Sequence, residues 1–349
     1  MNPVTDAKTI RVAVNGYGVI GKRVAAAVAL QGDMSLAGVS DVVTDWRAGM
    51  ATRNGFRLFG ATSEHASGMR AAGLEVAGTL DDLLGQADLV VDCTPKGVSA
   101  KNIDGYRRRG LKFIVQGGEK HEATGHSFVA EANYASALGR EATRVVSCNT
   151  TSIVRTLTAL KRAGLLRRAR GTLLRRATDP WESHVSGIMN TLVPEPEIPS
   201  HQSRDAQTVD PDLDVVTMAV KVPETLAHLH YWSVQMTRRA SQEKILDTFR
   251  SSSRIALIRI SDGLVALNTV KELMADRGRP NDNLYEVALW ADMLSVQGDE
   301  LFYAYMVDNQ AIVIPETIDA IRALTGLVHD VHESIARTNT ALGIETLFA

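Results

Sequence analysis

A glycine-rich turn near the N-terminus limits the possible fold more than any other feature of this chain. The sequence GYGVIG at 16–21 follows a β-branched, apolar segment at 9–15 and precedes strong helix formers at 22–30. In this setting the glycines allow a tight turn and close helix–strand packing, and the N–H groups that begin the helix can hold a pyrophosphate. The pattern therefore predicts a dinucleotide-binding unit that uses Gly16, Gly18 and Gly21.

An acidic residue follows the second predicted strand of this unit. Asp41 comes directly after the strand-like segment SLAGVS at 35–40. A carboxylate at this position can accept hydrogen bonds from the ribose hydroxyls of NAD and repel the 2′-phosphate of NADP. Val42 and Val43 offer no side-chain donor to such a phosphate. We therefore expect NAD to be preferred over NADP; the alternative is a solvated aspartate at a strand end.

The rest of the N-terminal region continues the alternation of strands and helices. Strand-like segments at 87–93 and 112–118 flank a helical segment at 98–109. This order is typical of a parallel sheet with helices on both faces. The expected fold class is α/β, with an N-terminal Rossmann domain over residues 1–147.

The pattern changes after residue 147. A helix is expected from about 149 to 163, and longer alternating segments follow at 171–178, 215–222, 228–236, 255–260 and 301–307. We expect an α/β catalytic domain over 148–314 with a mostly antiparallel sheet. Residues 194–214 are rich in Pro, Asp and Ser and are interpreted as an ordered loop or a flexible insert. One long amphipathic helix is expected at 315–339. The C-terminal segment 315–349 that contains it is expected to pack on the first domain.

Composition excludes several classes of protein. The 349 residues carry 38 Lys and Arg against 40 Asp and Glu, a balance that argues against a dedicated nucleic-acid binder. Two cysteines cannot build a disulfide framework, which favours a reducing compartment such as the cytoplasm. No apolar run is long enough to span a membrane. No Cys-x-x-Cys or His-x-x-x-His pattern accompanies the candidate site, so we expect no metal.

One cysteine stands where a nucleophile would be activated. Cys148 lies in Ser-Cys-Asn-Thr-Thr at a predicted strand-to-helix junction. Exposed N–H groups and the helix dipole favour a thiolate there. Cys93, in contrast, follows the apolar run LVVD and is expected to be a buried structural thiol.

Histidines and arginines of the predicted strands could complete the site. Alternation places His228 and His230 on the same face of their strand, and spacing alone leaves open which one is the base or whether either is a core histidine. Arg175 and Arg176 must face opposite sides of theirs, and one of them could bind a phosphate group. The alternative for the arginines is an exposed basic pair.

Seven segments taken together resemble one known family. They are NGYGVIGKRVA (15–25), DCTPKGVSAKN (92–102), VQGGEKHE (115–122), RVVSCNTT (144–151), LRRATDP (174–180), TMAVKVPETLAHLH (217–230) and IVIPETIDAIRA (312–323). They are similar to the archaeal-type, or type II, phosphorylating glyceraldehyde-3-phosphate dehydrogenases. The similarity extends in order over nearly the whole chain.

The resemblance implies a homotetramer of two-domain subunits that use NAD, a small anionic aldehyde and inorganic phosphate. It implies that Cys148 attacks the aldehyde and that His228, the first histidine of its segment, acts as the base. Cofactor contacts correspond to Val19, Ile20, Gly118 and Arg176, and substrate contacts to Ser147 and Asn149. We expect Arg175 and His201 to join the substrate contacts.

The chain departs from the family pattern at three places. Pro199-Ser200-His201-Gln202 stands where members commonly have P-S-H-H, so Gln202 replaces a histidine. Asp308-Asn309-Gln310-Ala311 stands where they have H-Q-E-S, so the glutamine on the nicotinamide side is Asn309 or has shifted to Gln310. Asp41-Val42-Val43 replaces the basic and hydroxyl residues that commonly follow the second strand. The first two departures leave the hydride chemistry intact but leave the substrate open. Because Gln202 cannot carry the positive charge of a histidine, it predicts weaker selection for glyceraldehyde 3-phosphate than in members with two histidines.

The interpretation is an NAD-dependent aldehyde dehydrogenase that forms a cysteine thioester and releases an acyl phosphate. Its expected reaction is glyceraldehyde 3-phosphate to 1,3-bisphosphoglycerate. The alternatives are the same chemistry on another small anionic aldehyde, such as a phosphonate or specialised metabolite, and a semialdehyde dehydrogenase of the aspartate or acetylglutamyl type. A non-catalytic or RNA-associating relative would not need both Cys148 and His228.

Overall fold

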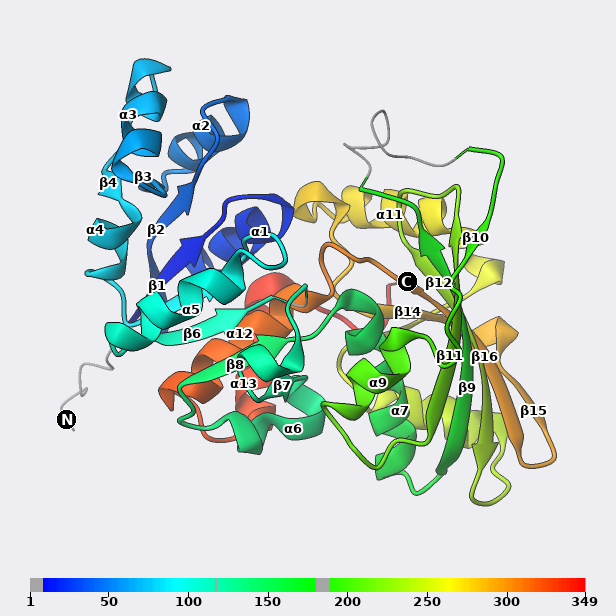
Figure 1. Cartoon of the computed structure of the whole chain (residues 1–349). Helices are drawn as coiled ribbons and strands as arrows, with labels where there is room; N and C mark the ends of the chain where they lie inside the picture. The colour runs from blue at the N-terminus through cyan, green and yellow to red at the C-terminus, as the bar shows by residue number, and fades with distance from the viewer. Residues whose placement is uncertain (1–8, 117, 180–188, 349) are drawn as a thin grey trace, which may run out of the picture. The chain divides into compact units, whose positions relative to one another are not determined.

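The computed structural model describes residues 9–116, 118–179 and 189–348 (Figure 1). The described residues form two compact units. The first contains the chain up to residue 146 together with 314–343, and the second contains 147–313 together with 344–349.

The first unit is built on a parallel sheet. Its strand order is β4-β3-β2-β1-β5-β6-β8-β7, and each neighbouring pair is parallel. The strands are β1 (Ile10–Asn15), β2 (Met34–Asp41), β3 (Leu58–Gly60), β4 (Gly78–Thr79), β5 (Leu89–Asp92), β6 (Lys112–Val115), β7 (Ser127–Phe128) and β8 (Ala142–Val145). The order reverses at β1, and ligands of such sheets bind at the carboxyl ends of the strands beside this reversal. The predicted Rossmann sheet is confirmed.

Helices connect these strands and bury the apolar runs of the sheet. They are α1 (Val19–Ala29), α2 (Trp46–Arg53), α3 (Ser63–Ala71), α4 (Leu80–Leu84), α5 (Ser99–Arg108) and α6 (Ala130–Ala137), with a short 3-10 turn η1 (His121–Ala123). The inward side of α1 is made of alanine, valine and glycine, and these small side chains let the helix lie close to β1 and β2. The first residues of α1 are thereby held at the carboxyl end of β1.

The long helix predicted at 315–339 is two helices. α12 (Val313–Thr325) ends one residue before Gly326, whose positive φ of 68° is not helical, and α13 (Val331–Leu342) begins after its cap Asp330. The buried Arg322 of α12 binds Asp33, with Nε 2.8 Å from Oδ2, and so ties α12 to the start of β2. Residues 344–349 lie in the second unit, whereas the sequence placed them with the first.

The sheet of the second unit is mixed. Its order is β10-β11-β9-β12-β16-β14-β13, with β15 also paired to β16. The strands are β9 (Leu166–Arg176), β10 (Val193–Pro194), β11 (Val215–Val222), β12 (His228–Met236), β13 (Ile255–Ile258), β14 (Val287–Trp290), β15 (Ser295–Gln297) and β16 (Glu300–Val307). The pairs β9–β11 and β13–β14 are parallel, so the expected mostly antiparallel sheet is corrected to a mixed one. Helical crossovers explain both pairs, because α9 lies between β9 and β11 and α11 between β13 and β14.

The helices of the second unit include one that runs through its core. They are α7 (Cys148–Arg162), α9 (His201–Gln207), α10 (Gln242–Arg250) and α11 (Leu267–Asp276), with 3-10 turns η3 (Ile260–Asp262), η4 (Pro280–Asp282) and η5 (Ala291–Met293). Figure 1 shows α7 and α9 side by side along the sheet. The fully buried Arg155 fixes α7 because its guanidinium donates to the carbonyls of Tyr285 (2.8 Å) and Ile312 (3.1 Å). α9 also corrects the expectation that 194–214 is a loop or insert.

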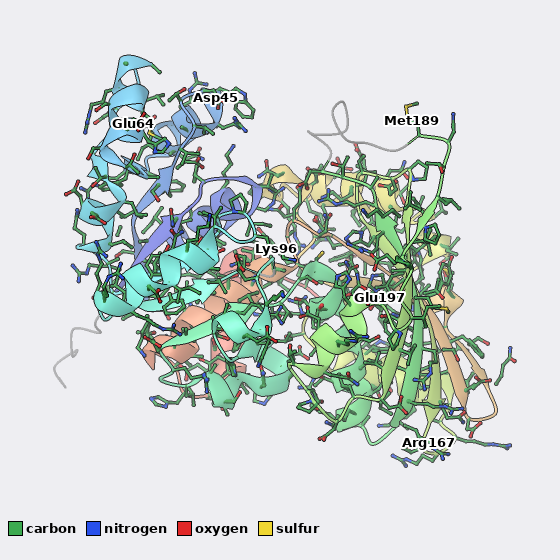
Figure 2. All side chains as sticks on the ribbon, viewed as in Figure 1. Asp45, Glu64, Lys96, Arg167, Met189 and Glu197 are labelled. Atoms are coloured by element: carbon green, nitrogen blue, oxygen red, sulfur yellow. The ribbon has the colours of Figure 1, made fainter. Side chains whose placement is uncertain are left out.

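The basic residues Arg167, Arg168 and Arg170 belong to the strand β9. Arg167 and Arg168 are exposed, and Figure 2 shows Arg167 at the end of the sheet where β9 begins. Arg175 is at the other end of the same strand.

Across the described ranges, no helix is both long and apolar enough to cross a membrane. Within those ranges no His, Cys, Asp or Glu side chains gather in threes as a metal site would require.

Candidate active site

Cys148 is the first residue of α7. Ser147 caps this helix, and its Oγ accepts a hydrogen bond from the backbone N–H of Thr150 at 3.4 Å. The Thr150 hydroxyl lies 2.9 Å from the same Oγ and donates to Asp205 of α9 at 2.6 Å. The first turn of α7 is therefore anchored by a cap and by a neighbouring helix. This geometry confirms the predicted strand-to-helix junction and explains how the thiol is held in place.

His228 is the histidine that faces the thiol. Its Nε2 lies 3.5 Å from Cys148 Sγ, and its Nδ1 accepts a hydrogen bond of 2.9 Å from the backbone N–H of Arg176. An imidazole nitrogen that accepts an N–H bond carries no proton. The proton of the neutral ring is therefore on Nε2, the atom that points at the sulfur.

His230 also contacts the first turn of α7, but through Asn149 and not through Cys148. Its Nε2 lies 2.8 Å from Asn149 Oδ1, and its Nδ1 lies 3.0 Å from the Tyr305 hydroxyl. Since an amide oxygen only accepts, His230 donates from Nε2 and orients the Asn149 amide. The predicted common face of His228 and His230 is confirmed, because both reach the first turn of α7.

Burial dominates the electrostatics of the site. Burial raises the pKa of the Cys148 thiol to about 11, against the opposing effects of Arg176, the Asn149 N–H and Arg175. This direction differs from the lowered thiol pKa that the helix start predicts. Burial also places the pKa of His228 well below its ordinary value and lowers that of His230 to about 3, so both rings are neutral near pH 7.

Cys93 contrasts with Cys148. It lies just beyond β5, and the residue is partly exposed, as Cys148 is, but its thiol is buried, as expected. Desolvation, reinforced by the charge of Asp92, raises the pKa of this thiol well above its ordinary value. Among the described residues, it has no histidine partner comparable to that of Cys148.

Arg175 and Arg176 bind different acidic residues. Arg175 Nη1 contacts Glu195, which directly follows β10. Arg176 binds Asp179 and also donates to the carbonyl of Thr225 at 3.1 Å. Both charges lower the pKa of Cys148. The two adjacent arginines therefore have different acidic partners.

Two of the three departures from the family pattern lie in the second unit. His201 begins α9 and its Nδ1 is 3.4 Å from Glu195 Oε2. Gln202 is fully buried; its Oε1 accepts from the Ser200 hydroxyl at 2.5 Å, and its Nε2 has no partner among the described residues. The Asn309 Oδ1 is likewise buried without a partner in the described part of the chain. Its neighbour Gln310 donates to Asp179 at 2.9 Å.

The glycine turn of the first unit has the form that an anion site requires. Gly16 has a φ of 90°, and a Cβ on Gly21 would lie 1.8 Å from the Gly16 carbonyl oxygen. Gly18 is the N-cap residue of α1, and a Cβ there would meet no atom within 4 Å among the described residues. No described side chain caps α1, so the amides of its first turn, at Val19 and Ile20, are available to a pyrophosphate.

Asp41 is fixed beside this turn. Its carboxylate accepts backbone N–H bonds from Tyr17 (2.7 Å), Val42 (2.6 Å) and Val43 (3.2 Å). A carboxylate has about four acceptor positions, so capacity remains for a ribose hydroxyl. Lys22 and Arg47 lie within electrostatic range of Asp41, which the sequence order did not indicate.

Gly118 lies near Lys96, which Figure 2 labels on the loop after β5. A Cβ on Gly118 would make an ordinary contact of 3.5 Å with the Lys96 Cβ. The local packing therefore does not by itself require glycine at this position.

Sequence reasoning missed three contributors to the site. Glu195 contacts two of the predicted substrate residues, the Asn149–His230 bond fixes an amide of the site, and Arg155 holds the nucleophile helix. For Arg155 the sequence carries one weak signal, an arginine two turns after the cysteine among uncharged residues, which indicates a buried side chain that holds the helix. The Glu195 and His230 contacts join residues distant in sequence, and no spacing rule indicates them.

Comparisons with known proteins identify the family of the chain. A family model described as the glyceraldehyde 3-phosphate dehydrogenase, C-terminal domain, matches residues 147–291. The chain is 42% identical over 334 residues to a glyceraldehyde-3-phosphate dehydrogenase of Methanothermus fervidus. This alignment covers 95% of this chain and 98% of that protein. The proteins of the same name from Metallosphaera sedula and Thermococcus kodakarensis are each 43% identical; each alignment covers 96% of this chain and 98% and 99% of those proteins, respectively. The resemblance inferred from the motifs is confirmed, and the chain belongs to the glyceraldehyde-3-phosphate dehydrogenase family.

Proposed function

We propose that this chain oxidises glyceraldehyde 3-phosphate, with NAD and inorganic phosphate, to 1,3-bisphosphoglycerate. The observation that carries the proposal is the Cys148–His228 pair, with Sγ and Nε2 3.5 Å apart at the start of α7. The family relatives bear the name of this activity.

The chemistry follows from the position of the ring proton of His228. The Cys148 thiol adds to the aldehyde carbon and its proton passes to the carbonyl oxygen, which forms a thiohemiacetal. The Nε2–H of the neutral His228 ring donates a hydrogen bond to this oxygen and stabilises its negative charge while the hydroxyl proton leaves to water, the carbonyl re-forms and hydride departs. His228 is a hydrogen-bond donor in this step, and the base role that the resemblance implies requires the other ring tautomer, with the proton on Nδ1. The dinucleotide, when bound, accepts the hydride.

A thioester on Cys148 results, and inorganic phosphate attacks its carbonyl carbon. The thiolate leaves, and the acyl phosphate is released. The Asn149 amide, whose oxygen is held by His230, has its NH2 end left to donate to a substrate oxygen. Ser147, Arg175, His201 and Gln202 are the further substrate contacts that we propose, on the family resemblance and on their proximity to α7 and α9.

NAD is the proposed cofactor, in preference to NADP. The uncapped start of α1, the open space at Gly18 and the fixed carboxylate of Asp41 support this. Gly16, Val19, Ile20 and Gly21 would form the pyrophosphate turn. Gly118, Arg176 and Asn309 are proposed as further cofactor contacts on the resemblance.

The resemblance also supports a division of labour and an assembly. We propose that residues 1–147, with the C-terminal helices, bind the cofactor and that 148–314 carry the chemistry. A homotetramer in the cytoplasm is the assembly and location that the family resemblance favours.

The test is NADH formation followed by absorbance, with and without inorganic phosphate. Glyceraldehyde 3-phosphate should give turnover that depends on phosphate. Unphosphorylated glyceraldehyde, a phosphonate analogue and aspartate semialdehyde form the comparison panel. A higher kcat/KM for any of these three would overturn the proposed substrate, and no NADH with any aldehyde would overturn the proposed activity.

A further inference from the structure

Three side chains from separate elements meet beside the substrate residues. Arg175 is near the end of β9, Glu195 directly follows β10, and His201 begins α9. One oxygen of the Glu195 carboxylate contacts Arg175 Nη1, and the other lies 3.4 Å from His201 Nδ1. The Glu195 side chain is only 18% exposed, so its carboxylate is held between these two groups.

Arg175 keeps a donor that its partner does not use. Its Nε is buried and has no hydrogen-bond partner among the described residues. A buried N–H without a partner is unfavourable, and a bound oxyanion would satisfy it. Arg176 differs, because its guanidinium already binds Asp179 and the Thr225 carbonyl. Arg175 is therefore the arginine of the pair that is prepared for an external anion.

The charge of Arg175 also acts on the reacting groups. It lowers the pKa of the Cys148 thiol and of the His228 ring. An anion bound to Arg175 would thus lie within electrostatic range of the nucleophile.

We propose that Glu195 determines specificity by competing with the anionic group of the substrate, or with inorganic phosphate, for the Arg175 guanidinium. Glu195 neutralises this guanidinium in the free protein, so an incoming phosphate group must displace it. The competition weakens binding of doubly charged phosphate groups and leaves neutral aldehydes unaffected by this exchange. The inference rests on the proposed function, since it takes Arg175 as a group that binds the substrate's anion.

The variant Glu195→Gln keeps the shape of the side chain and removes its charge. Glu197→Gln is the matched control, because Glu197 is an exposed glutamate two residues away in the same segment and is labelled in Figure 2. Titration calorimetry of the full-length chain with inorganic phosphate measures binding without any dehydrogenase activity. We expect Glu195→Gln to bind phosphate at least about fivefold more tightly than the unaltered chain, as removal of a competing ion pair implies. Glu197→Gln should bind as the unaltered chain does.

Arg175→Gln tests whether the effect passes through this guanidinium. In that background Glu195→Gln should no longer tighten phosphate binding, because the group for which Glu195 competes is gone. Kinetics give a second readout, in which the ratio of kcat/KM for glyceraldehyde 3-phosphate to that for glyceraldehyde should rise in Glu195→Gln and stay constant in Glu197→Gln.

The outcomes separate this inference from the proposed activity. Tighter phosphate binding without turnover of any aldehyde would support the role of Glu195 and contradict the activity. Unchanged or weaker phosphate binding in Glu195→Gln would overturn the role of Glu195, as would tightening that persists without Arg175.

Discussion

The helices α1 and α7 both begin where a strand ends, yet their first turns are built in opposite ways. α1 starts directly after Gly18, has no side-chain cap among the described residues, and has open space at the position of a Gly18 Cβ. α7 starts behind the cap Ser147, and its first turn is held by Asp205 and His230. Each helix offers the positive end of its dipole to negative charge.

The difference reflects what each end must hold. A pyrophosphate arrives from solution and binds through several amides, so its site must remain free of side chains. A thiolate is part of the chain, and catalysis depends on holding its sulfur in the position and orientation from which it attacks the aldehyde carbon. An open turn therefore suits a ligand that comes and goes, and a capped turn suits a covalent nucleophile.

The largest expected effect comes from removal of the nucleophile of α7. Cys148→Ser should reduce kcat for aldehyde oxidation by at least about a thousandfold, because a hydroxyl of much higher pKa replaces the thiol. Steady-state NADH formation measures the loss. Cys93→Ser is the matched control and should retain turnover, since Cys93 has no histidine partner in the described residues. Activity that survives in Cys148→Ser would remove the assigned role of α7.

The pH dependence of alkylation shows which influence on the thiol prevails. Burial raises the pKa of the Cys148 thiol to about 11. At any pH below this value, raising the pH by one unit should increase the thiolate fraction about tenfold. Labelling by iodoacetamide should therefore accelerate about a hundredfold between pH 7 and pH 9, provided the protein stays folded.

Peptide mapping provides the comparison for this experiment. Cys93 should label more slowly at each pH, because its thiol pKa is raised well above the ordinary value. A Cys148 rate that is already maximal at pH 7 would show that the helix end outweighs burial, as the sequence alone predicted.

Sequence reasoning succeeded where structure follows from local order. The glycine turn, Asp41 at the end of β2 and Cys148 at the start of α7 each depend on a few consecutive residues, and the parallel sheet follows from alternating segments. It failed where long-range contacts decide. The break at Gly326 in the C-terminal helix was not recognised, and the parallel β9–β11 pair depends on a crossover.

The candidate site shows the same division. Alternation indicated that His228 and His230 share a face but could not assign one to Cys148 and the other to Asn149, because those partners are about 80 residues away. Glu195 could not be found at all, since only the fold brings it to Arg175.

On the side of α1, Asp41 should control the choice of cofactor. Two unit charges about 4 Å apart repel by about 4 kcal/mol at an effective dielectric of 20, and a screened remnant of about 1.4 kcal/mol is a factor of ten. We expect kcat/KM for NAD to exceed that for NADP by at least about tenfold. Asp41→Lys should reduce or invert the ratio, whereas Asp104→Asn, an exposed carboxylate on α5, should leave it unchanged. Equal efficiencies in the unaltered chain would show that Lys22 and Arg47 offset the carboxylate.

The open space at Gly18 predicts a specific loss of binding. A Cβ at this residue meets no described atom within 4 Å, so Gly18→Ala should fold normally but place a methyl group where the pyrophosphate approaches. NAD affinity, measured by calorimetry, should fall about fivefold, which corresponds to about 1 kcal/mol. Gly21→Ala is the contrasting variant and should lower the melting temperature, because its Cβ collides with the Gly16 carbonyl. Unchanged NAD affinity in Gly18→Ala would place the pyrophosphate elsewhere.

The smallest effect is expected from the cap of α7, and it separates two roles of Ser147. Its hydroxyl accepts from the Thr150 N–H at a long 3.4 Å, and Asp205 still holds Thr150 when Ser147 is removed. Ser147→Ala should therefore weaken the first turn by only about 0.5–1 kcal/mol, seen as a twofold to fivefold loss of hydrogen-exchange protection. Thr62→Ala removes the comparable cap of α3, a 3.3 Å bond to the His65 N–H, and should leave protection of α7 unchanged. If Ser147 is only a cap, KM for glyceraldehyde 3-phosphate should rise by no more than the same factor, about twofold to fivefold. A much larger rise in KM would instead show that the Ser147 hydroxyl contacts the substrate, as the family resemblance implies, and that the capped end of α7 also binds a ligand.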